Sequence, residues 1–371
     1  MLADDDFEIF LVATPGLEAE LCTEARLRKF DKPLIVAGGI VIRGGWREVW
    51  RANLELRGVS RVLVRIGSFR APHLAQLDKR SRKFPWGDFL RQDVPVSVEA
   101  TCKSSRIYHG GAAAQRIATA LREEFGATIS DDADLMIKAR IDDDLCTISI
   151  DTSGDSLHKR GHKSAIGKAP LRETLAAMIL QRCDYDAREL LVDPMCGSGT
   201  FVIEAAEMAA GLNPGRTRSF AFELLKNFDA KAWQTMRDWR PNITPPRQFF
   251  GSDRDAGAIK MSRANAARAG VTAFTTFQCH AISDLQPPPG PPGLVIVNPP
   301  FGLRIGDKKP LHDLYGALGK ILREKFKGWR VGLITTEPAL AKSTGLPFAA
   351  PGRPVSHGGL KVLLFQTKPL V

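Results

Sequence analysis

Four short apolar runs in the C-terminal half of the chain each end on a polar residue and are separated by segments with helical periodicity. The runs are ELLVD, FFGSD, GLVIVN and RVGLITT. Apolar strands that alternate with helices form a parallel sheet, because each return between parallel strands needs a crossover helix. This half of the chain therefore predicts a Rossmann-like α/β domain, with its ligand site beyond the carboxyl ends of the strands.

The N-terminal half follows a different pattern. Over about residues 5–70 the elements read βαββαβ, which is typical of a ferredoxin-like unit. A strand-like VPVSVEAT, a helical segment at 111–125 and the alternating run LMIKARIDDDLCTISIDTSG indicate a second small α+β unit. We predict domains at residues 1–65, 66–155 and 156–371. The last domain opens with a basic, glycine-rich linker that ends near residue 169.

Charge adds a further constraint. The 371 residues contain 52 Lys and Arg against 41 Asp and Glu, a net charge of +11. Such a balance fits a polyanionic partner, with nucleic acid first, although a basic surface without any partner would carry the same charge. Six cations crowd the edges of the second unit, as RNA contacts or as a solvated face: Lys79, Arg80, Arg82, Lys83, Lys103 and Arg106.

Cysteines and apolar runs bear on the compartment. Six cysteines lie far apart, with no C-x-x-C pair and no His cluster at zinc spacing: Cys22, Cys102, Cys146, Cys183, Cys196 and Cys279. The N-terminus MLADDDFEIF lacks a signal pattern, and no run reaches the roughly 18 apolar residues of a membrane span. We therefore expect a cytoplasmic protein with reduced thiols, no metal site and no membrane partner, acting as a monomer.

The segment DPMCGSGT, residues 193–200, lies between the strand ELLV and a helical segment. Its glycines let the backbone turn tightly and approach a ligand, and the following helix offers free amide donors. Phosphate loops and dinucleotide sites share such a turn, but this one lacks their third glycine and their Lys-Ser/Thr pair. Because an acidic residue ends the strand instead, the turn favours a zwitterionic ligand with an ammonium group over a pyrophosphate.

Asp253 ends the run FFGSD, directly before another helical segment. A carboxylate at the tip of the second strand of a doubly wound sheet can hold a ribose diol by accepting hydrogen bonds from both hydroxyl groups. The same place in the chain suits a helix cap, which either Asp253 or Asp255 could provide. We expect Asp253 to contact a ribose, with capping as the alternative.

Asn298 ends the run GLVIVN and precedes Pro299, Pro300 and Phe301. The prolines fix the backbone and lack amide hydrogens, so the strand cannot continue and carbonyl groups are left without partners. With the side-chain oxygen of Asn298, these carbonyls can accept both hydrogens of an NH2 group, and Phe301 can stack on a base. The motif therefore predicts a site for an exocyclic amine.

These motifs occur together with LHKRGHKSAIGKAPLRETLAAMIL before them and LHDLYGALGKILRE after them. In this combination the chain resembles the THUMP-domain class I RNA methyltransferases, specifically the bacterial family that forms N2-methylguanosine in 23S ribosomal RNA. The resemblance spans nearly the whole chain, is strongest from about Leu157 to Thr336, and rests mainly on layout before that. It implies an S-adenosylmethionine-dependent enzyme with a Rossmann-like methyltransferase domain behind a ferredoxin-like and THUMP-like region that grips RNA.

The resemblance also implies roles for individual residues. Asp193 and the glycine turn would lie near the methionine part of the cofactor, Asp253 on its ribose, and Asn298 on the target base. The residues expected at the cofactor are Asp193, Pro194, Met195, Cys196, Gly197, Gly199, Thr200, Asp253, Arg254, His280, Ala281 and Asn298. Those expected at the reacting amine are Asn298, Pro299, Pro300 and Phe301.

One position departs from the family pattern. An Asp usually lies beside the adenine after the third strand, where this chain reads CHAISD over residues 279–284. Contact of a carboxylate with the adenine is therefore in doubt here. His280 or a backbone amide is the expected substitute.

Several alternatives stay open. The N-P-P-F motif fits amines on either purine, so guanine N2 in transfer RNA and adenine N6 are alternative targets. A further hypothesis is that the chain is an inactive RNA-binding or ribosome-assembly protein. Cys196 has no His or acid placed to activate it, which disfavours covalent catalysis. Residues 212–247 form an insertion with the amphipathic stretch FELLKNFDAKAWQTMRDW, which could be a lid, a core-capping helix or an RNA contact.

The N-terminal half carries one more expectation. Residues 1–155 should bind structured RNA on their own, with a log affinity that falls linearly with log salt, because cations replace the counterions on phosphates.

Overall fold

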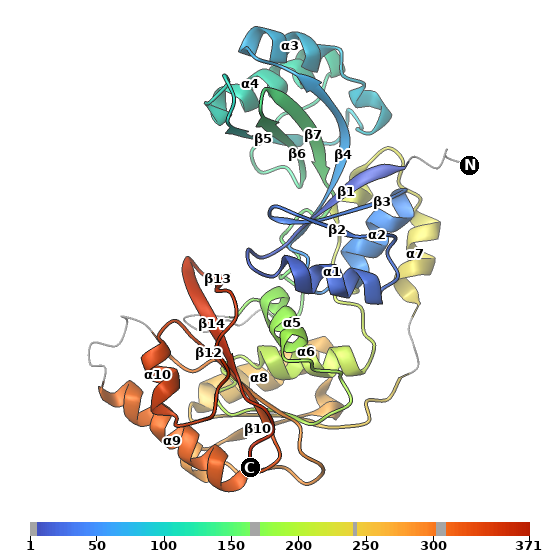
Figure 1. The fold of residues 1–371 in the computed structure, drawn as a ribbon. Coiled ribbons are helices and arrows are strands. Elements are labelled where there is room, and N and C mark those ends of the chain that lie inside the picture. Colours follow the sequence, from blue (N-terminus) through green and yellow to red (C-terminus); the bar gives the residue numbers. More distant parts are fainter. Residues whose placement is uncertain (1–5, 164–170, 240–242, 302–308) are drawn as a thin grey trace. The chain divides into compact units, whose positions relative to one another are not determined.

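The computed structural model describes residues 6–163, 171–239, 243–301 and 309–371. Its elements form two compact units, and each unit draws on separate stretches of the chain (Figure 1). The first unit comprises Met1–Ala13, Leu21–Leu157 and Arg218–Trp239. The second comprises Thr14–Glu20, His158–Thr217 and Arg240–Val371.

The first unit holds a seven-stranded sheet in the order β2-β3-β1-β4-β7-β6-β5. The elements are β1 (Phe7–Val12), α1 (Glu18–Leu27, which starts in the second unit), β2 (Leu34–Val36), β3 (Gly39–Gly44), α2 (Trp46–Glu55), β4 (Arg61–Arg70), α3 (Leu74–Arg82), β5 (Val96–Lys103), α4 (Gly110–Ala120), β6 (Leu135–Asp142) and β7 (Leu145–Asp151). The predicted βαββαβ order of β1 to β4 is confirmed. β4 runs through the expected boundary at 65/66, and the division into domains there stays a prediction.

Side chains of this sheet alternate between a buried face and an open face. On β1, Ile9 and Leu11 are fully buried, whereas Glu8 and Phe10 are only partly so. The same alternation runs along β4 and β6. Since successive side chains of a strand point to opposite faces, one face of the sheet carries the core and the other lies open.

The insertion at residues 212–247 contributes to the core of the first unit. Its helix α7 (Ala230–Asp238) lies alongside α2 (Figure 1). Trp233 of α7 is 2% exposed, and its ring centroid lies 6.3 Å from that of Trp50 on α2. Phe222, also from the insertion, stacks on Trp50 at 6.0 Å. Of the three roles considered for this stretch, core capping is therefore the one that these contacts support.

The second unit holds a sheet in the order β10-β9-β8-β11-β12-β14-β13. The elements are α5 (Glu173–Arg182), β8 (Leu191–Asp193), α6 (Thr200–Ala209), β9 (Phe249–Asp253), α8 (Ala256–Ala269), β10 (Thr275–Cys279), β11 (Leu294–Val297), α9 (Lys309–Lys325), β12 (Arg330–Thr335), α10 (Pro338–Ser343), β13 (Val355–His357) and β14 (Leu360–Gln366). The predicted parallel α/β sheet is confirmed from β10 to β12.

The edge of this sheet differs from the all-parallel expectation. β14 pairs antiparallel with β12, and β13 pairs antiparallel with β14. Gly358 and Gly359 join the last two strands with φ of 56° and 84°. These left-handed conformations let the chain reverse in a tight hairpin, so no crossover helix is needed.

Net charge is unequally divided between the two units. The first contains 26 Lys and Arg against 25 Asp and Glu, and the second 26 against 16. The excess that the sequence analysis associated with an RNA-gripping N-terminal half therefore lies in the second unit. Any electrostatic grip by the first unit must come from local clustering of its cations.

Candidate active site

The strand order of the second sheet brings two loops together at the carboxyl ends of its parallel strands. β8 lies between β9 and β11, so the chain leaves β8 toward one side and later returns on the other. Val192 of β8 and Val295 of β11 are paired in parallel register. The turn 193–200 and the motif 298–301 therefore both begin at the carboxyl ends of neighbouring strands. Doubly wound sheets bind ligands at such a switch point, because diverging loops leave a crevice.

The glycine turn begins at Asp193, the last residue of β8, which is 3% exposed. The Oδ1 atom of Asp193 accepts a hydrogen bond from the amide of Met195 at 3.1 Å. Gly197 and Gly199 have φ of 52° and 84°, a region costly for other residues. A Cβ on Gly199 would also lie 3.2 Å from the Phe277 ring. Both conformation and space therefore require glycine at position 199.

Asp253 ends β9 and is tied to this turn. Its Oδ2 atom accepts a hydrogen bond from the Gly197 amide at 3.0 Å, and its Oδ1 atom accepts one from the Asp255 amide at 3.0 Å. Asp255 is the residue that caps α8, since its side chain accepts from Gly257 at 2.7 Å. The capping alternative thus applies to Asp255, and the partly exposed carboxylate of Asp253 stays available for a ligand.

The two carboxylates influence each other. Burial raises the pKa of Asp193 to about 8, a rise that the Met195 amide opposes and that the neighbouring Asp253 carboxylate increases. Within the described residues, neither carboxylate forms an ion pair with a cation. A bound ammonium group would stabilise the ionised form of Asp193. The assignment of Asp193 to the ammonium group and of Asp253 to the ribose of S-adenosylmethionine stays a prediction.

The other residues expected at the cofactor lie around Asp253. The amide of His280 donates to the Asp253 carbonyl at 3.1 Å, and Nδ1 of His280 lies 3.0 Å from the carbonyl of Ala281. Arg254 and Ala281 are exposed. Their position at the ends of β9 and β10 suits contact with an adenine, and that contact stays a prediction.

Cys196 lies in the glycine turn and is buried. Burial raises the pKa of its thiol, and the Asp193 carboxylate raises it further. A buried, protonated thiol is a poor nucleophile. This environment fits the structural role that was favoured over covalent catalysis.

Asn298 follows β11 and carries the feature that most points to a ligand. Its Oδ1 atom is buried and has no hydrogen-bond partner among the described residues. The carbonyl of Pro300 accepts a hydrogen bond from the Tyr315 hydroxyl at 3.3 Å, whereas no described residue donates to the Pro299 carbonyl. Because an unpaired buried acceptor is unfavourable, a donor is expected here. Asn298 Oδ1 and the Pro299 carbonyl are thus two acceptors without a donor among the described residues, and both are candidates to receive an amine.

Tyr315 is a positioning residue that the sequence analysis missed. It lies on α9 and is fully buried in the apolar stripe of that helix. Burial raises the pKa of Tyr315 to about 12, so its hydroxyl stays protonated and donates at neutral pH. A tyrosine in a buried apolar stripe usually needs a partner for its hydroxyl, and this was the available signal.

Two basic residues in the stretch ahead of these motifs are buried, and the interpretation of the stretch as a linker stays a prediction. Arg160 and His162 are 2% and 4% exposed. Arg160 lies 3.4 Å from Glu204, and His162 lies 3.8 Å from Glu207, both on α6. A guanidinium can be buried when it meets a carboxylate, as Arg160 does. Burial lowers the pKa of His162, which favours its neutral form. The rest of the expected linker, residues 164–169, lies outside the described residues.

Two side chains link this buried layer to the glycine turn. Lys163 Nζ donates to Thr200 Oγ1 at 2.9 Å, and Asn265 Nδ2 donates to the Ser198 carbonyl at 3.0 Å. No local pattern marks Asn265, because its partner lies 67 residues away in the chain. These bonds tie the end of the turn to the residues packed around it.

Phe301 and Met195 come from the two loops and pack against one hydrophobic cluster. The cluster includes Val297 of β11 and Leu311 of α9. The structure therefore brings the glycine turn and the N-P-P-F motif onto a shared apolar base. Stacking of Phe301 on a nucleic-acid base stays a prediction.

Two family models match the chain. One is described as the RMKL-like methyltransferase domain and matches residues 160–353, which include every residue expected at the site. The other is described as the RlmL ferredoxin-like domain and matches residues 8–63, the stretch with the βαββαβ order.

Two relatives illustrate the likeness. Ribosomal RNA large subunit methyltransferase K/L of Syntrophotalea carbinolica is 37% identical over 363 residues, which are 92% of this chain and 51% of that protein. The protein slr0064 of Synechocystis sp., whose name assigns it provisionally to the RNA methyltransferases, is 30% identical over 370 residues. That match covers 96% of this chain and 95% of the relative. The chain thus spans about half of the K/L protein and nearly all of the second relative.

Solved structures share the whole architecture. A Listeria monocytogenes structure described as a predicted N6-adenine-specific DNA methylase has a TM-score of 0.88 and 27% identity, and the match covers 98% of this chain and 97% of that chain. SMU.472, a methyltransferase by its description, was solved in complex with SAH. It has a TM-score of 0.86 and 26% identity, and the match covers 99% of each chain.

The described residues contain neither a candidate membrane helix nor a candidate metal site. None of the helices there is long and apolar enough to cross a membrane. Likewise, no group of three or more His, Cys, Asp or Glu within the described ranges is arranged to hold a metal ion.

Proposed function

Because this chain belongs to the family of RMKL-like methyltransferases, we propose that it transfers a methyl group from S-adenosylmethionine to the N2 amine of a guanine in large-subunit ribosomal RNA. The observation that carries this proposal is the buried Oδ1 atom of Asn298, which has no hydrogen-bond partner among the described residues. It lies at the same carboxyl ends of the strands as Asp193. Relatives named as ribosomal RNA methyltransferases support the choice of substrate.

Each side chain has a distinct task in this reaction. S-adenosylmethionine, when bound, supplies an electrophilic methyl group on a sulfonium. Asp193 would hold the ammonium group of its methionine part, and Asp253 the ribose hydroxyls. Asn298 Oδ1 and the Pro299 carbonyl would accept both hydrogens of the target NH2, which turns the nitrogen lone pair away from the ring. Positioning of this kind supplies most of the rate, and the proton can leave to water without a general base.

The proposal is tested by mass mapping of ribosomal RNA from cells with and without the gene. The expected result is the loss of one N2-methylguanosine in the large-subunit RNA, restored when the gene is returned. An unchanged methylation map would contradict the proposed substrate.

Adenine N6 is the second candidate target, and one observation favours it. The Listeria monocytogenes structure similar to this chain is described as an N6-adenine-specific DNA methylase. The two acceptors at Asn298 and Pro299 do not distinguish the purines. Mapping of N6-methyladenine in both the RNA and the DNA of the same cells separates the candidates, because a missing methyl on adenine would replace guanine in the proposal.

Tyr315 gives a prediction about positioning. Tyr315→Phe removes the hydrogen bond to the Pro300 carbonyl and frees the turn that presents Asn298. Loss of one neutral hydrogen bond corresponds to about a 2- to 12-fold effect, which we expect in kcat with the affinity for S-adenosylmethionine unchanged. Single-turnover methyl transfer and equilibrium titration of the cofactor measure the two quantities.

Tyr185→Phe is the matched control. Tyr185 is also buried in the second unit, and its hydroxyl has no hydrogen-bond partner among the described residues. Removing that hydroxyl should leave kcat at the wild-type value. Equal losses in both variants, or a weaker cofactor affinity in Tyr315→Phe, would contradict the positioning role.

A further inference from the structure

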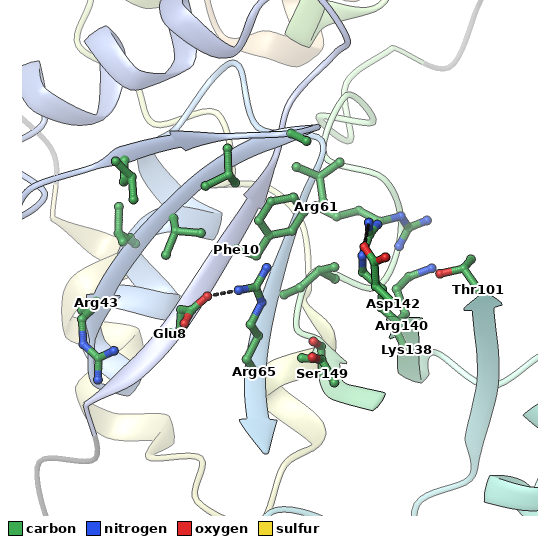
Figure 2. A pocket seen from close by; sticks show the side chains of 18 of the residues that line it. Glu8, Phe10, Arg43, Arg61, Arg65, Thr101, Lys138, Arg140, Asp142 and Ser149 are labelled. Atoms are coloured by element: carbon green, nitrogen blue, oxygen red, sulfur yellow. Dashed lines mark hydrogen bonds and ion pairs between the residues drawn. The ribbon is translucent and has the colours of Figure 1, made fainter. Parts of the chain in front are cut away.

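The open face of the first sheet is hollowed into a groove of about 900 Å³ (Figure 2). Its lining comes from strands of both halves of the unit, for example Phe10 on β1 and Arg140 on β6. It lies on the face opposite the buried residues Ile9 and Ile137. None of the residues assigned to methyl transfer lines it, so the groove needs an explanation of its own.

A row of polar and charged side chains crosses this groove. Glu8 lies between Arg43 and Arg65 in the register of three adjacent strands. Ser149 lies between Arg65 and Lys138 in the next three. Neighbouring strands are about 4.8 Å apart, so the three cations recur at intervals of about 10 Å across the sheet. Figure 2 shows Arg43, Arg65 and Lys138 along this row. Such a row can follow a polyanion from strand to strand.

An apolar row runs beside the charged one. Phe10 lies between Val41 and Leu63, and Leu34 lies beyond Val41. Leu34 is 63% exposed. The guanidinium of Arg65 lies over the Phe10 ring, 5.2 Å from its centroid. The guanidinium plane covers the ring and is itself a surface on which an unstacked base can stack.

The charges of the lining indicate which partner fits. Six cations face four carboxylates: Lys32, Arg43, Arg61, Arg65, Lys138 and Arg140 against Glu8, Asp31, Glu99 and Asp142. The first unit as a whole is nearly balanced, with 26 cations and 25 carboxylates, so its small excess gathers here. Five of these cations already pair with a carboxylate: Arg43 with Asp6, Arg61 with Asp151, Arg65 with Glu8, Lys138 with Glu99 and Arg140 with Asp142. The excess of cations in the lining favours an anion, which can bind by taking the place of a carboxylate. An anionic partner with flat apolar groups satisfies both rows.

The cations of the groove can be recruited at low cost. Lys138 pairs with Glu99 at 2.7 Å, and Arg140 pairs with Asp142 at 2.7 Å, both on the surface. Pairs of this kind contribute little to stability, because water screens them. A phosphate can therefore replace the carboxylate at either cation without disturbing the fold.

We propose that this groove binds an unpaired segment of RNA, with a base on the stack that Arg65 forms over Phe10 and phosphates at Arg43, Lys138 and Arg140. The inference rests on the proposed function, since it takes RNA as the substrate. It also revises the expected grip on structured RNA, because the first unit has almost no excess charge and stacking must supply much of the affinity.

Fluorescence anisotropy of the full chain with a short 5′-labelled single-stranded RNA tests the groove. Phe10→Leu keeps an apolar side chain but removes the ring, and should raise the Kd about 5- to 30-fold. Arg140→Gln should lower the slope of log affinity against log salt by about 0.7. Arg91→Gln is the matched control, because Arg91 pairs with Asp93 two residues away, as Arg140 does with Asp142, but lies outside the groove.

The outcomes separate the groove from the proposed function. Wild-type binding by Phe10→Leu and Arg140→Gln, or an RNA duplex that competes better than the single strand, would overturn the groove. Methyl transfer to ribosomal RNA is measured in parallel, and Phe10→Leu should raise the KM for RNA with kcat unchanged. A wild-type chain that binds the strand through Phe10 but methylates no RNA overturns the function and leaves the groove in place.

Discussion

Asn298→Ala is expected to slow methyl transfer by about 100- to 1,000-fold while the affinity for S-adenosylmethionine stays nearly unchanged. The Oδ1 atom that is lost has no partner among the described residues, and it is one of two acceptors available for the target amine. Its loss costs orientation in the transition state more than binding in the ground state, so the effect belongs in kcat. Single-turnover transfer to ribosomal RNA at saturating S-adenosylmethionine is the measurement.

Stability supplies a control for this variant. Because Oδ1 of Asn298 is buried without a partner among the described residues, truncation breaks no hydrogen bond there, and the free energy of unfolding should not fall. Asn298→Asp keeps an acceptor at the same position and should lose less activity than the alanine variant. A wild-type rate for Asn298→Ala would show that N-P-P-F is only a turn and does not orient the amine. Loss of cofactor binding would assign Asn298 to the part of the site that holds S-adenosylmethionine.

The parts of the site that could be predicted are those governed by local backbone chemistry. Gly197 and Gly199 adopt left-handed conformations that the turn requires, and Pro299 ends a strand wherever it occurs. Such features follow from a few neighbouring residues. The parallel order of β8 to β12 was equally accessible, because alternating strands and helices leave few other topologies.

Helix α3 shows where prediction from the local sequence failed. The stretch from Lys79 to Lys83 was interpreted only as a charge run, yet Leu74–Arg82 is helical, with Leu77 among its few buried residues. Arg82 forms ion pairs with Asp78, Glu123 and Glu124. At least one cation considered for RNA therefore has carboxylate partners within the fold. Asp78 is four residues away, whereas Glu123 and Glu124 lie too far along the chain for a local pattern to reveal them.

Long-range packing decided the remaining differences. Trp233 and Phe222 join the core around Trp50, across more than 170 residues of chain. Periodicity marked α7 as amphipathic but could not say which surface its apolar face covers. The same limit hid Arg160, whose burial depends on Glu204 of α6. A sequence window registers the charge of a residue and not its partner.

Asp253→Ala is expected to weaken S-adenosylmethionine binding by about 10- to 150-fold, because it removes a charged acceptor for the ribose hydroxyls. Asp255→Ala is the matched control. Asp255 lies two residues away and caps α8 through Gly257, so its loss should lower the free energy of unfolding by about 0.5–2 kcal/mol without changing cofactor affinity. Calorimetric titration gives the affinity, and thermal unfolding gives the stability.

A weaker affinity alone would not prove contact with the ribose, since Asp253 also accepts a hydrogen bond from the Gly197 amide and so shapes the turn. A double-mutant cycle separates the two effects. If Asp253 holds the ribose, wild-type protein should bind S-adenosylhomocysteine more tightly than its 2′-deoxy analogue, and Asp253→Ala should bind both alike. If the variant still prefers the hydroxyl by the wild-type factor, Asp253 acts through the turn, and the ribose must be held by another residue at this edge of the sheet.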